Sequence, residues 1–170
     1  MAILLGYRGS GKTTTGRILA DRLWTDFLDT DAMVVKAAGR SIAEIFEADG
    51  EAAFRELEAA AVAEAVQREG AVIALGGGAV LAEGNRAQLT ASGHSRVYLK
   101  CDPAELHRRI QADPATAASR PALTAAGGGL EEITALLAER EPLYRAVKTA
   151  ELDVSRLSVE EAATYLGKMI

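Results

Sequence analysis

Residues 6–13, Gly-Tyr-Arg-Gly-Ser-Gly-Lys-Thr, constrain the fold of this chain more than any other segment. They match the pattern Gly-x-x-x-x-Gly-Lys-Ser/Thr, in which glycines let consecutive backbone N–H groups turn toward phosphate oxygens without a Cβ clash. The apolar run at residues 2–5 predicts a buried strand before the loop, and residues 11–23 predict a helix after it. The positive end of that helix would point at the same anion. The sequence therefore predicts a strand–loop–helix unit that binds nucleotide phosphates.

The chemistry of this loop assigns its polar residues. Lys12 is long enough to reach the β- and γ-phosphates, and the hydroxyl of Thr13 can ligate Mg²⁺. We predict that the nucleotide contacts a continuous set of residues, namely Gly9, Ser10, Gly11, Lys12, Thr13 and Thr14.

Short β-like runs alternate with amphipathic helical stretches along the chain, which is typical of a parallel sheet covered by helices. The other predicted strands are residues 26–29, 71–75, 96–100 and 151–154, and the other predicted helices are residues 41–46, 51–69 and 130–147, with further helices starting at 103 and 158. Ser41 with Glu44 and Ser158 with Glu161 form capping-box patterns at two of these starts. No linker or repeat interrupts the pattern, so we expect one α/β domain over residues 1–170.

Composition limits the partners. The chain has 19 Lys and Arg against 24 Asp and Glu, a net charge of −5, so its overall field does not attract nucleic acid. We therefore predict a small anionic ligand held by local basic groups.

No apolar stretch approaches the roughly 20 residues of a membrane span, and the apolar opening is too short for a signal peptide. The single cysteine fits a reducing compartment. We expect a cytoplasmic monomer without membrane contact.

Polar and glycine-rich positions beyond the loop predict the rest of the site. Asp29 and Asp31 end a predicted strand, and ligands bind beyond the carboxyl ends of parallel strands, so both carboxylates should lie near the phosphate loop. Capping of the next helix is the simpler alternative. Glycines at 76–78 follow another strand and indicate close approach of a ligand or a tight turn. Arg55 and Glu58 share a helix face, as site residues or as an exposed salt bridge.

Residues 113–129 break the alternation with two prolines and three successive glycines. A run of this length inside a compact domain is typical of a mobile functional loop or of disorder, and we predict a lid. Arg120 in this stretch and Arg145 in the following helix are candidates for contacts with anions, although a solvated surface arginine is the commoner case.

Taken together, these motifs resemble the shikimate kinase family. The resemblance runs from Ile3 to about Val154, with matching order and spacing at residues 6–13, 27–31, 41–46, 54–58, 75–78, 120–123 and 142–145. It implies a three-layer α/β/α fold of the nucleoside-monophosphate-kinase type, with a five-stranded parallel sheet and a mobile lid. It also implies ATP as co-substrate, Mg²⁺ as metal, and phosphorylation of the shikimate 3-hydroxyl on the route to chorismate and aromatic amino acids.

The resemblance also implies roles for individual residues. Lys12 would hold the β- and γ-phosphates, Thr13 would bind Mg²⁺, and Asp29 would reach the metal through water. Asp31 would hold hydroxyls of shikimate and help to activate the one that attacks. The remaining assignments are Arg55 and Arg145 on the substrate carboxylate, Gly77 and Gly78 as further substrate contacts, Arg120 over the phosphates, and Arg109 against adenine.

This sequence departs from the family pattern near the lid, where the segment between Arg109 and Arg120 is longer, Arg-Pro-Ala-Leu replaces Arg-Pro-Leu-Leu, and a glycine run follows. Two other functions remain open on chemical grounds. One is a kinase for another small anionic acceptor, such as gluconate or a nucleoside monophosphate, against which the ordered motifs argue. The other is a non-catalytic nucleotide-binding module, which would be expected to lose the aspartate pair or Arg120.

Overall fold

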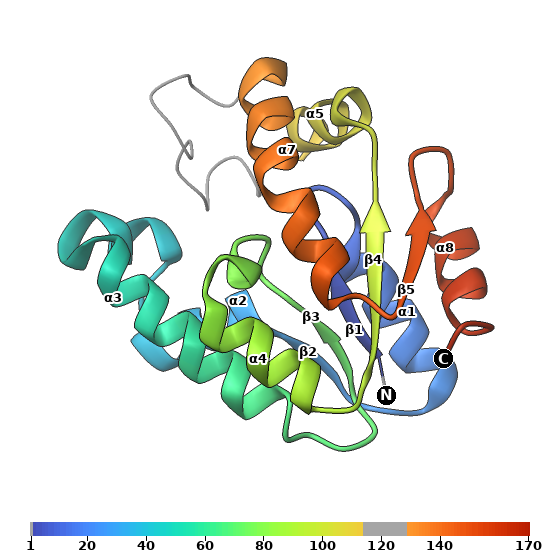
Figure 1. Cartoon of the computed structure of the whole chain (residues 1–170), viewed down its shortest axis with the longest axis horizontal. Helices are drawn as coiled ribbons and strands as arrows, with labels where there is room; N and C mark the ends of the chain where they lie inside the picture. The colour runs from blue at the N-terminus through green and yellow to red at the C-terminus, as the bar shows by residue number, and fades with distance from the viewer. Residues whose placement is uncertain (1, 114–128) are drawn as a thin grey trace.

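The computed structural model describes residues 2–113 and 129–170, so the predicted lid, including Arg120, lies outside the described residues except at its two ends (Figure 1). Five strands form one sheet in the order β2-β3-β1-β4-β5. They are β1 (Ala2–Leu5), β2 (Phe27–Asp29), β3 (Val72–Ala74), β4 (Ser95–Lys100) and β5 (Ala150–Asp153). Every pair of neighbouring strands is parallel, which confirms the predicted sheet.

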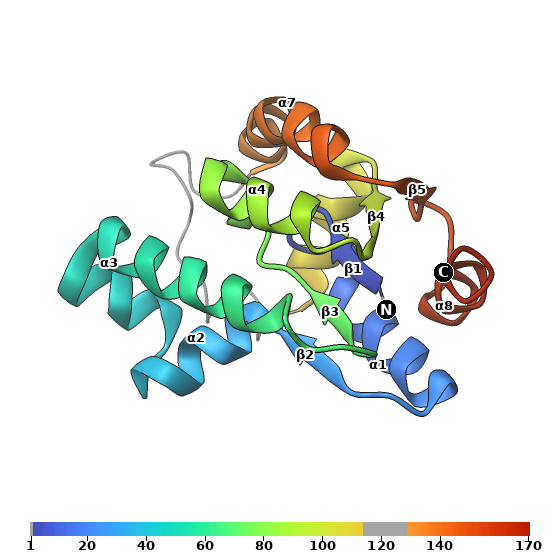
Figure 2. The same ribbon diagram turned by 60° about the horizontal axis from the view of Figure 1, so that its bottom comes forward.

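Helices cover both faces of the sheet. They are α1 (Lys12–Leu23), α2 (Thr30–Ala38), α3 (Ile42–Ala65), α4 (Glu83–Ala91), α5 (Pro103–Ala112), α7 (Leu130–Val147) and α8 (Val159–Leu166), with a short 3-10 turn η1 (Ala79–Leu81). In Figure 2, α4 and α7 lie over one face and α1 and α8 over the other. The expected three-layer α/β/α architecture is therefore confirmed.

The central strands explain the position of the phosphate loop. β1 and β3 consist of apolar residues that are all buried, as expected for strands covered on both faces. The core extends from them to the inner sides of the surrounding helices. Because β1 lies in the middle of the sheet, the loop that follows it opens at the centre of the sheet's carboxyl edge.

Helices α2 and α3 form an arm that extends beyond the β2 edge (Figure 2). The two helices predicted at 41–46 and 51–69 are joined into α3, with a kink at Gly50, whose φ of 82° is left-handed. The arm has a small apolar core of its own, in which the Phe46 and Phe54 rings lie 4.8 Å apart. It forms one wall of a cavity described below.

Two elements, η1 and α4, were not predicted from the sequence, and α2 was expected only as a helix after Asp29–Asp31, without bounds. The strands agree with prediction to within one or two residues at their ends, and both capping boxes, at Ser41 and Ser158, are present. No helix in the described part of the chain is both long enough and apolar enough to cross a bilayer.

Candidate active site

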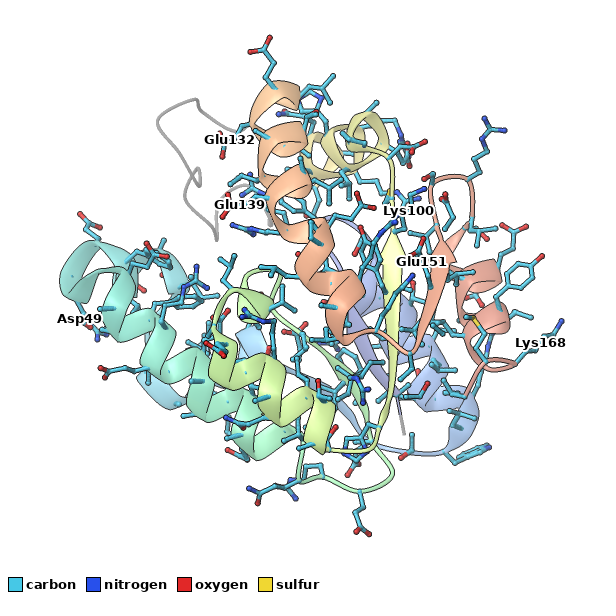
Figure 3. All side chains as sticks on the ribbon, in the orientation of Figure 1. Asp49, Lys100, Glu132, Glu139, Glu151 and Lys168 are labelled. Atoms are coloured by element: carbon cyan, nitrogen blue, oxygen red, sulfur yellow. The ribbon has the colours of Figure 1, made fainter. Side chains whose placement is uncertain are left out.

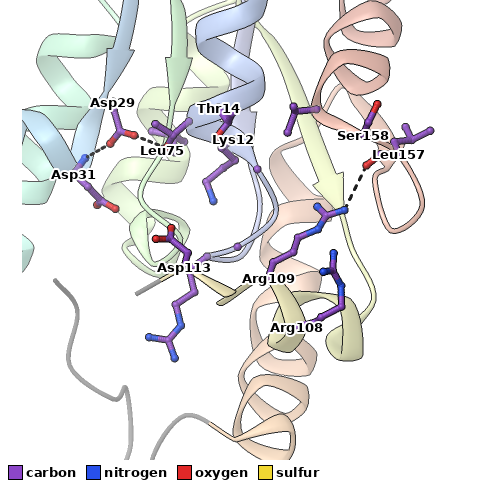
Figure 4. Close-up of a pocket in the computed structure, with 15 residues that line it drawn as sticks. Lys12, Thr14, Asp29, Asp31, Leu75, Arg108, Arg109, Asp113, Leu157 and Ser158 are labelled. Atoms are coloured by element: carbon purple, nitrogen blue, oxygen red, sulfur yellow. Dashed lines mark hydrogen bonds between the residues drawn. The ribbon is translucent and has the colours of Figure 1, made fainter. Parts of the chain in front are cut away.

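The carboxyl ends of three neighbouring strands bring the predicted site residues together. Asp29 and Leu4 both pair with Ala74 of β3, so β1, β2 and β3 end at the same edge. The Thr13 hydroxyl donates a hydrogen bond to Asp29 Oδ2 at 2.7 Å. Asp29 Oδ1 also accepts a hydrogen bond from the backbone N–H of Asp31 (Figure 4) and another from that of Ala32. Asp29 therefore caps α2 and also faces the phosphate loop.

A first cavity, of about 480 Å³, lies over the phosphate loop, and we call it the loop cavity (Figure 4). Gly9 and Gly11 have left-handed φ angles of 81° and 87°, which let the chain curl around this space. Lys12 is buried, and its Nζ donates hydrogen bonds to the carbonyls of Gly6 and Tyr7 at 2.8 and 2.9 Å. Ser10 is also buried, while Thr14 lines the cavity. The loop thus presents an ammonium group and a helix N-terminus to one compact space.

The oxygens of Thr13 and Asp29 could hold a metal ion at this cavity. They are hard donors of the kind that Mg²⁺ prefers, and they lie next to each other. Among residues 2–113 and 129–170 there is no cluster of three His, Cys, Asp or Glu side chains suited to a metal. The residues present therefore fit Mg²⁺ held largely by phosphates and water, which is its usual coordination in kinases.

The far wall of the loop cavity comes from α5 and from the start of α8. Arg109 lines it and donates a hydrogen bond to the Val154 carbonyl at 2.8 Å. Hydrogen bonds from Arg108 and Arg109 lower the pKa of Glu105 to about 2, so this carboxylate holds the Arg109 side chain in place. Apolar atoms of Leu157 and Val159 lie in the same wall. A flat base could rest there while its phosphates reach the loop.

A second cavity, of about 720 Å³, lies between α3, α7 and the turn after β3, and we call it the α3 cavity. Arg55 from α3, Gly77 and Gly78 from the turn, and Asp31 line it, with Phe46 and Phe54 among its apolar residues. Glu139 lies on the side of α7 that faces the arm (Figure 3) and lines the same cavity. Asp31 also lines the loop cavity, so the two cavities meet at this carboxylate.

Arg55 is held by two carboxylates of its own helix. Its Nη1 donates to Glu58 at 2.8 Å, and its Nη2 donates to Glu51 at 3.0 Å. Burial opposes the charged form of Arg55, but these hydrogen bonds and charges outweigh it and raise its pKa. Burial raises the pKa of Glu58, with a further increase from Asp31 and an opposing effect from Arg55. The predicted Arg55–Glu58 pair, with Glu58 buried and Arg55 half-buried, is therefore part of the cavity wall and not an exposed salt bridge.

The glycine turn after β3 leaves little room for side chains. A Cβ on Gly78 would lie 2.7 Å from Nη1 of Arg55, and one on Gly77 would lie 3.2 Å from the backbone N of Arg8. The Thr30 hydroxyl accepts a hydrogen bond from Gly76 N, and the Tyr144 hydroxyl donates to the Gly77 carbonyl. The turn is thus fixed from both sides, with its backbone facing the α3 cavity.

The structure places Arg145, which the sequence assigned to the substrate carboxylate, away from both cavities. Its side chain is about half exposed, pairs with Glu141 at 3.0 Å, and lines neither cavity. Arg140, on the same helix, is buried and lines the α3 cavity. Arg140 and Arg145 are five residues apart on one α-helix, so their side chains point in directions that differ by roughly 140° around the helix axis.

The sequence contains a signal for Arg140, namely its position on the apolar stripe of α7. The buried stripe of α7 contains Ile133, Leu137, Tyr144 and Val147, and Arg140 falls on that stripe. Its guanidinium carbon lies 5.6 Å from the centre of the buried Tyr7 ring. An arginine among core positions of a helix is a candidate for binding an anion, because burying it without a partner is costly.

Arg8 was also missed from the sequence. It occupies a variable position of the loop motif, is buried, and lines both cavities. The guanidiniums of Arg8 and Arg140 both act on the Tyr7 phenol, whose pKa is nevertheless raised because burial dominates.

A phosphate loop at the centre of a five-stranded parallel sheet, with a second cavity that meets it at an aspartate, defines a P-loop kinase. Comparison with known proteins gives the particular family. The family model for shikimate kinase matches residues 8–170. A shikimate kinase of Thermobifida fusca is 45% identical over 168 residues, which is 99% of this chain and 93% of that protein. The chain belongs to the shikimate kinase family.

Solved structures agree with this assignment. Shikimate kinase from Acinetobacter baumannii, determined in complex with shikimate, matches with a TM-score of 0.90 and 32% identity, covering 99% of this chain and 90% of that one. A gluconokinase from Sinorhizobium meliloti matches with a TM-score of 0.59 at 17% identity, covering 99% of this chain and 93% of that one, which shows the shared fold alone.

Proposed function

We propose that this chain transfers the γ-phosphoryl group of ATP to the 3-hydroxyl of shikimate, giving shikimate 3-phosphate and ADP. The observation that carries the proposal is the junction at Asp31, where a cavity over a phosphate loop meets a cavity lined by arginines. Membership of the shikimate kinase family supports the same reaction.

Transfer proceeds in line and without a covalent enzyme intermediate. The acceptor oxygen bonds to the γ-phosphorus as the bond from phosphorus to the β,γ-bridging oxygen breaks, and ADP leaves with that electron pair. Asp31 orients the hydroxyl and accepts its proton. Lys12 and the backbone N–H groups of the loop neutralise charge on the phosphates. Arg120 would close over them, an assignment that rests on the sequence because it lies outside the described residues.

The carboxylate of the acceptor binds to Arg55 and Arg140. These guanidiniums come from different helices, α3 and α7, and both line the α3 cavity. A planar guanidinium can bind a carboxylate through two parallel hydrogen bonds, which an ammonium group cannot. Gly77 and Gly78 contribute backbone groups to the same cavity. This pair replaces the Arg55–Arg145 pair expected from the sequence.

We also propose that Thr13, and Asp29 through water, hold Mg²⁺, which when bound supplies positive charge to the phosphates. Arg109 and the wall around it would contact adenine. A cytoplasmic location and a monomeric enzyme belong to the proposal on composition alone.

The test follows the phosphorylated product of ATP and shikimate by ³¹P NMR in wild type and in an Asp31→Asn variant. If Asp31 accepts the proton, the variant loses about 10²-fold or more in kcat. Asp21→Asn, on the exposed side of α1, is the matched control. A wild-type enzyme that forms no phosphorylated shikimate would refute the proposal, and an unaffected Asp31→Asn variant would refute the role of Asp31.

A further inference from the structure

Arg8 lies at the point where the two cavities meet. Its side chain is 8% exposed and lines both the loop cavity and the α3 cavity, a position it shares with Asp31. Its backbone, which is part of the phosphate loop, packs against the glycine turn, since a Cβ on Gly77 would lie 3.2 Å from Arg8 N. A buried cation and a carboxylate therefore lie at the passage between the nucleotide and the acceptor.

The guanidinium of Arg8 has no carboxylate partner in the described part of the chain. Its Nε is buried without a hydrogen-bond acceptor, and the phenol of Tyr7 is a polar group on which its guanidinium acts. Arg55 is paired with Glu51 and Glu58, and Arg108 and Arg109 are paired with Glu105, whereas Arg140, like Arg8, forms no ion pair with a described carboxylate. Burying a guanidinium without an anionic partner is costly, so a ligand anion is the expected partner.

We propose that Arg8 is a catalytic residue whose guanidinium binds the oxygens of the phosphoryl group as it passes from ATP to the acceptor hydroxyl. The inference rests on the proposed function, because it requires a nucleotide in the loop cavity and an acceptor in the α3 cavity. Lys12 is tied to the start of the loop, whereas Arg8 reaches the passage itself. In the transition state, charge is spread over the equatorial oxygens of the phosphoryl group, and a planar guanidinium matches two of them.

Asp31 and Arg8, which carry opposite charges, have different roles at the passage. Asp31 attracts the hydroxyl and its proton, while Arg8 attracts the phosphoryl oxygens and repels neither substrate. The carboxylate of the acceptor is accounted for by Arg55 and Arg140, which line the α3 cavity and not the loop cavity. Arg8 lines both cavities, so its guanidinium can instead bind the phosphoryl group that moves from one cavity to the other.

The experiment compares Arg8→Gln and Arg8→Lys with wild type. Arg68→Gln is the matched control, since Arg68 is exposed on the surface and lines neither cavity. Four quantities are measured: kcat, the KM values for ATP and shikimate, the Kd of ADP, and the Kd of fluoroaluminate in the presence of ADP and shikimate. Fluoroaluminate bound with ADP mimics the phosphoryl group in transit. Calorimetry supplies the binding constants, and thermal melts report folding.

We expect Arg8→Gln to lower kcat by about 10²-fold or more and to weaken fluoroaluminate binding by a similar factor. Both KM values and the Kd of ADP should stay within about threefold of wild type, because the contact forms with the group in transit. Arg8→Lys keeps the positive charge but not the planar guanidinium that can bind two oxygens, so its kcat should lie between those of Arg8→Gln and wild type.

Three outcomes would overturn the proposal: unchanged kcat, a raised KM for shikimate with kcat intact, or a Kd of ADP that rises as much as that of fluoroaluminate. If thermal melts show that Arg8→Gln does not fold, the same three outcomes are applied to Arg8→Lys instead. A wild-type enzyme inactive on shikimate would overturn the proposed function. In that case the role of Arg8 falls with it, whereas the three outcomes above, in an enzyme active on shikimate, overturn the role of Arg8 alone.

Discussion

The clearest prediction concerns the two arginines of α7. Arg140→Met removes the guanidinium and keeps an apolar stem over the Tyr7 ring, so the fold should be retained. No carboxylate within residues 2–113 and 129–170 forms an ion pair with Arg140, so the substitution leaves no buried charge unpaired. Besides the contact of the guanidinium with the Tyr7 ring, the loss should therefore fall on contacts with the ligand.

The magnitude follows from one charge-assisted interaction with the carboxylate of shikimate. Such an interaction contributes about 1.5–3 kcal/mol in typical cases. Because 1.4 kcal/mol is a factor of ten, the Kd of shikimate should rise by about 10- to 150-fold. The KM for ATP should not change, since Arg140 does not line the loop cavity.

Isothermal titration calorimetry with shikimate is the appropriate assay. The single tryptophan, Trp24, is 95% exposed at the end of α1 and lines neither cavity, so its fluorescence would be a poor reporter. Arg145→Met, from the exposed side of the same helix, is the control and should leave the Kd of shikimate unchanged. If Arg145→Met weakened shikimate binding and Arg140→Met did not, the reasoning from the structure would be refuted.

Three further substitutions test separate parts of the account. Lys12→Ala should lower kcat by about 10²-fold or more in coupled ADP-release assays, and near-normal turnover would count against the loop cavity as the phosphate site. Gly78→Ala should push against Arg55 and raise the KM for shikimate by about tenfold or more with the KM for ATP unchanged, whereas equal changes in both would contradict a local effect. The pKa of Glu105, held at about 2 against a usual 4.5 by two arginines, means that its carboxylate stabilises the fold above pH 4.5 and that this stabilisation is lost as the pH falls toward 2. Glu105→Gln should therefore show a smaller fall in melting temperature over that pH range, and an identical fall would contradict it.

The sequence predicted those parts of the fold and site that depend on local patterns. The phosphate loop, the alternation of strands and helices, and the two capping boxes each occupy a few consecutive residues. Asp29 and Asp31 could be placed at the sheet edge because parallel strands end together. The Arg55–Glu58 pair could be expected because residues three apart share a helix face.

The missed features depend on packing or on weak local signals. Helix α4 begins after Ala82, which provides no side-chain cap, and Leu89 is its large buried apolar residue, so the sequence contains little to mark it. The choice between Arg140 and Arg145 depends on the rotation of α7 relative to the sheet, which motif spacing does not give. Arg8 occupies a position that the loop motif leaves free, and its placement becomes visible when both cavities are known.

The account depends most on the acceptor that the α3 cavity selects. Coupled release of ADP, measured in parallel with shikimate, gluconate and AMP under the same ATP and Mg²⁺ concentrations, tests this directly. We predict rapid ADP release with shikimate and release near the background rate of ATP hydrolysis with the other two. Faster release with gluconate or AMP than with shikimate would contradict it.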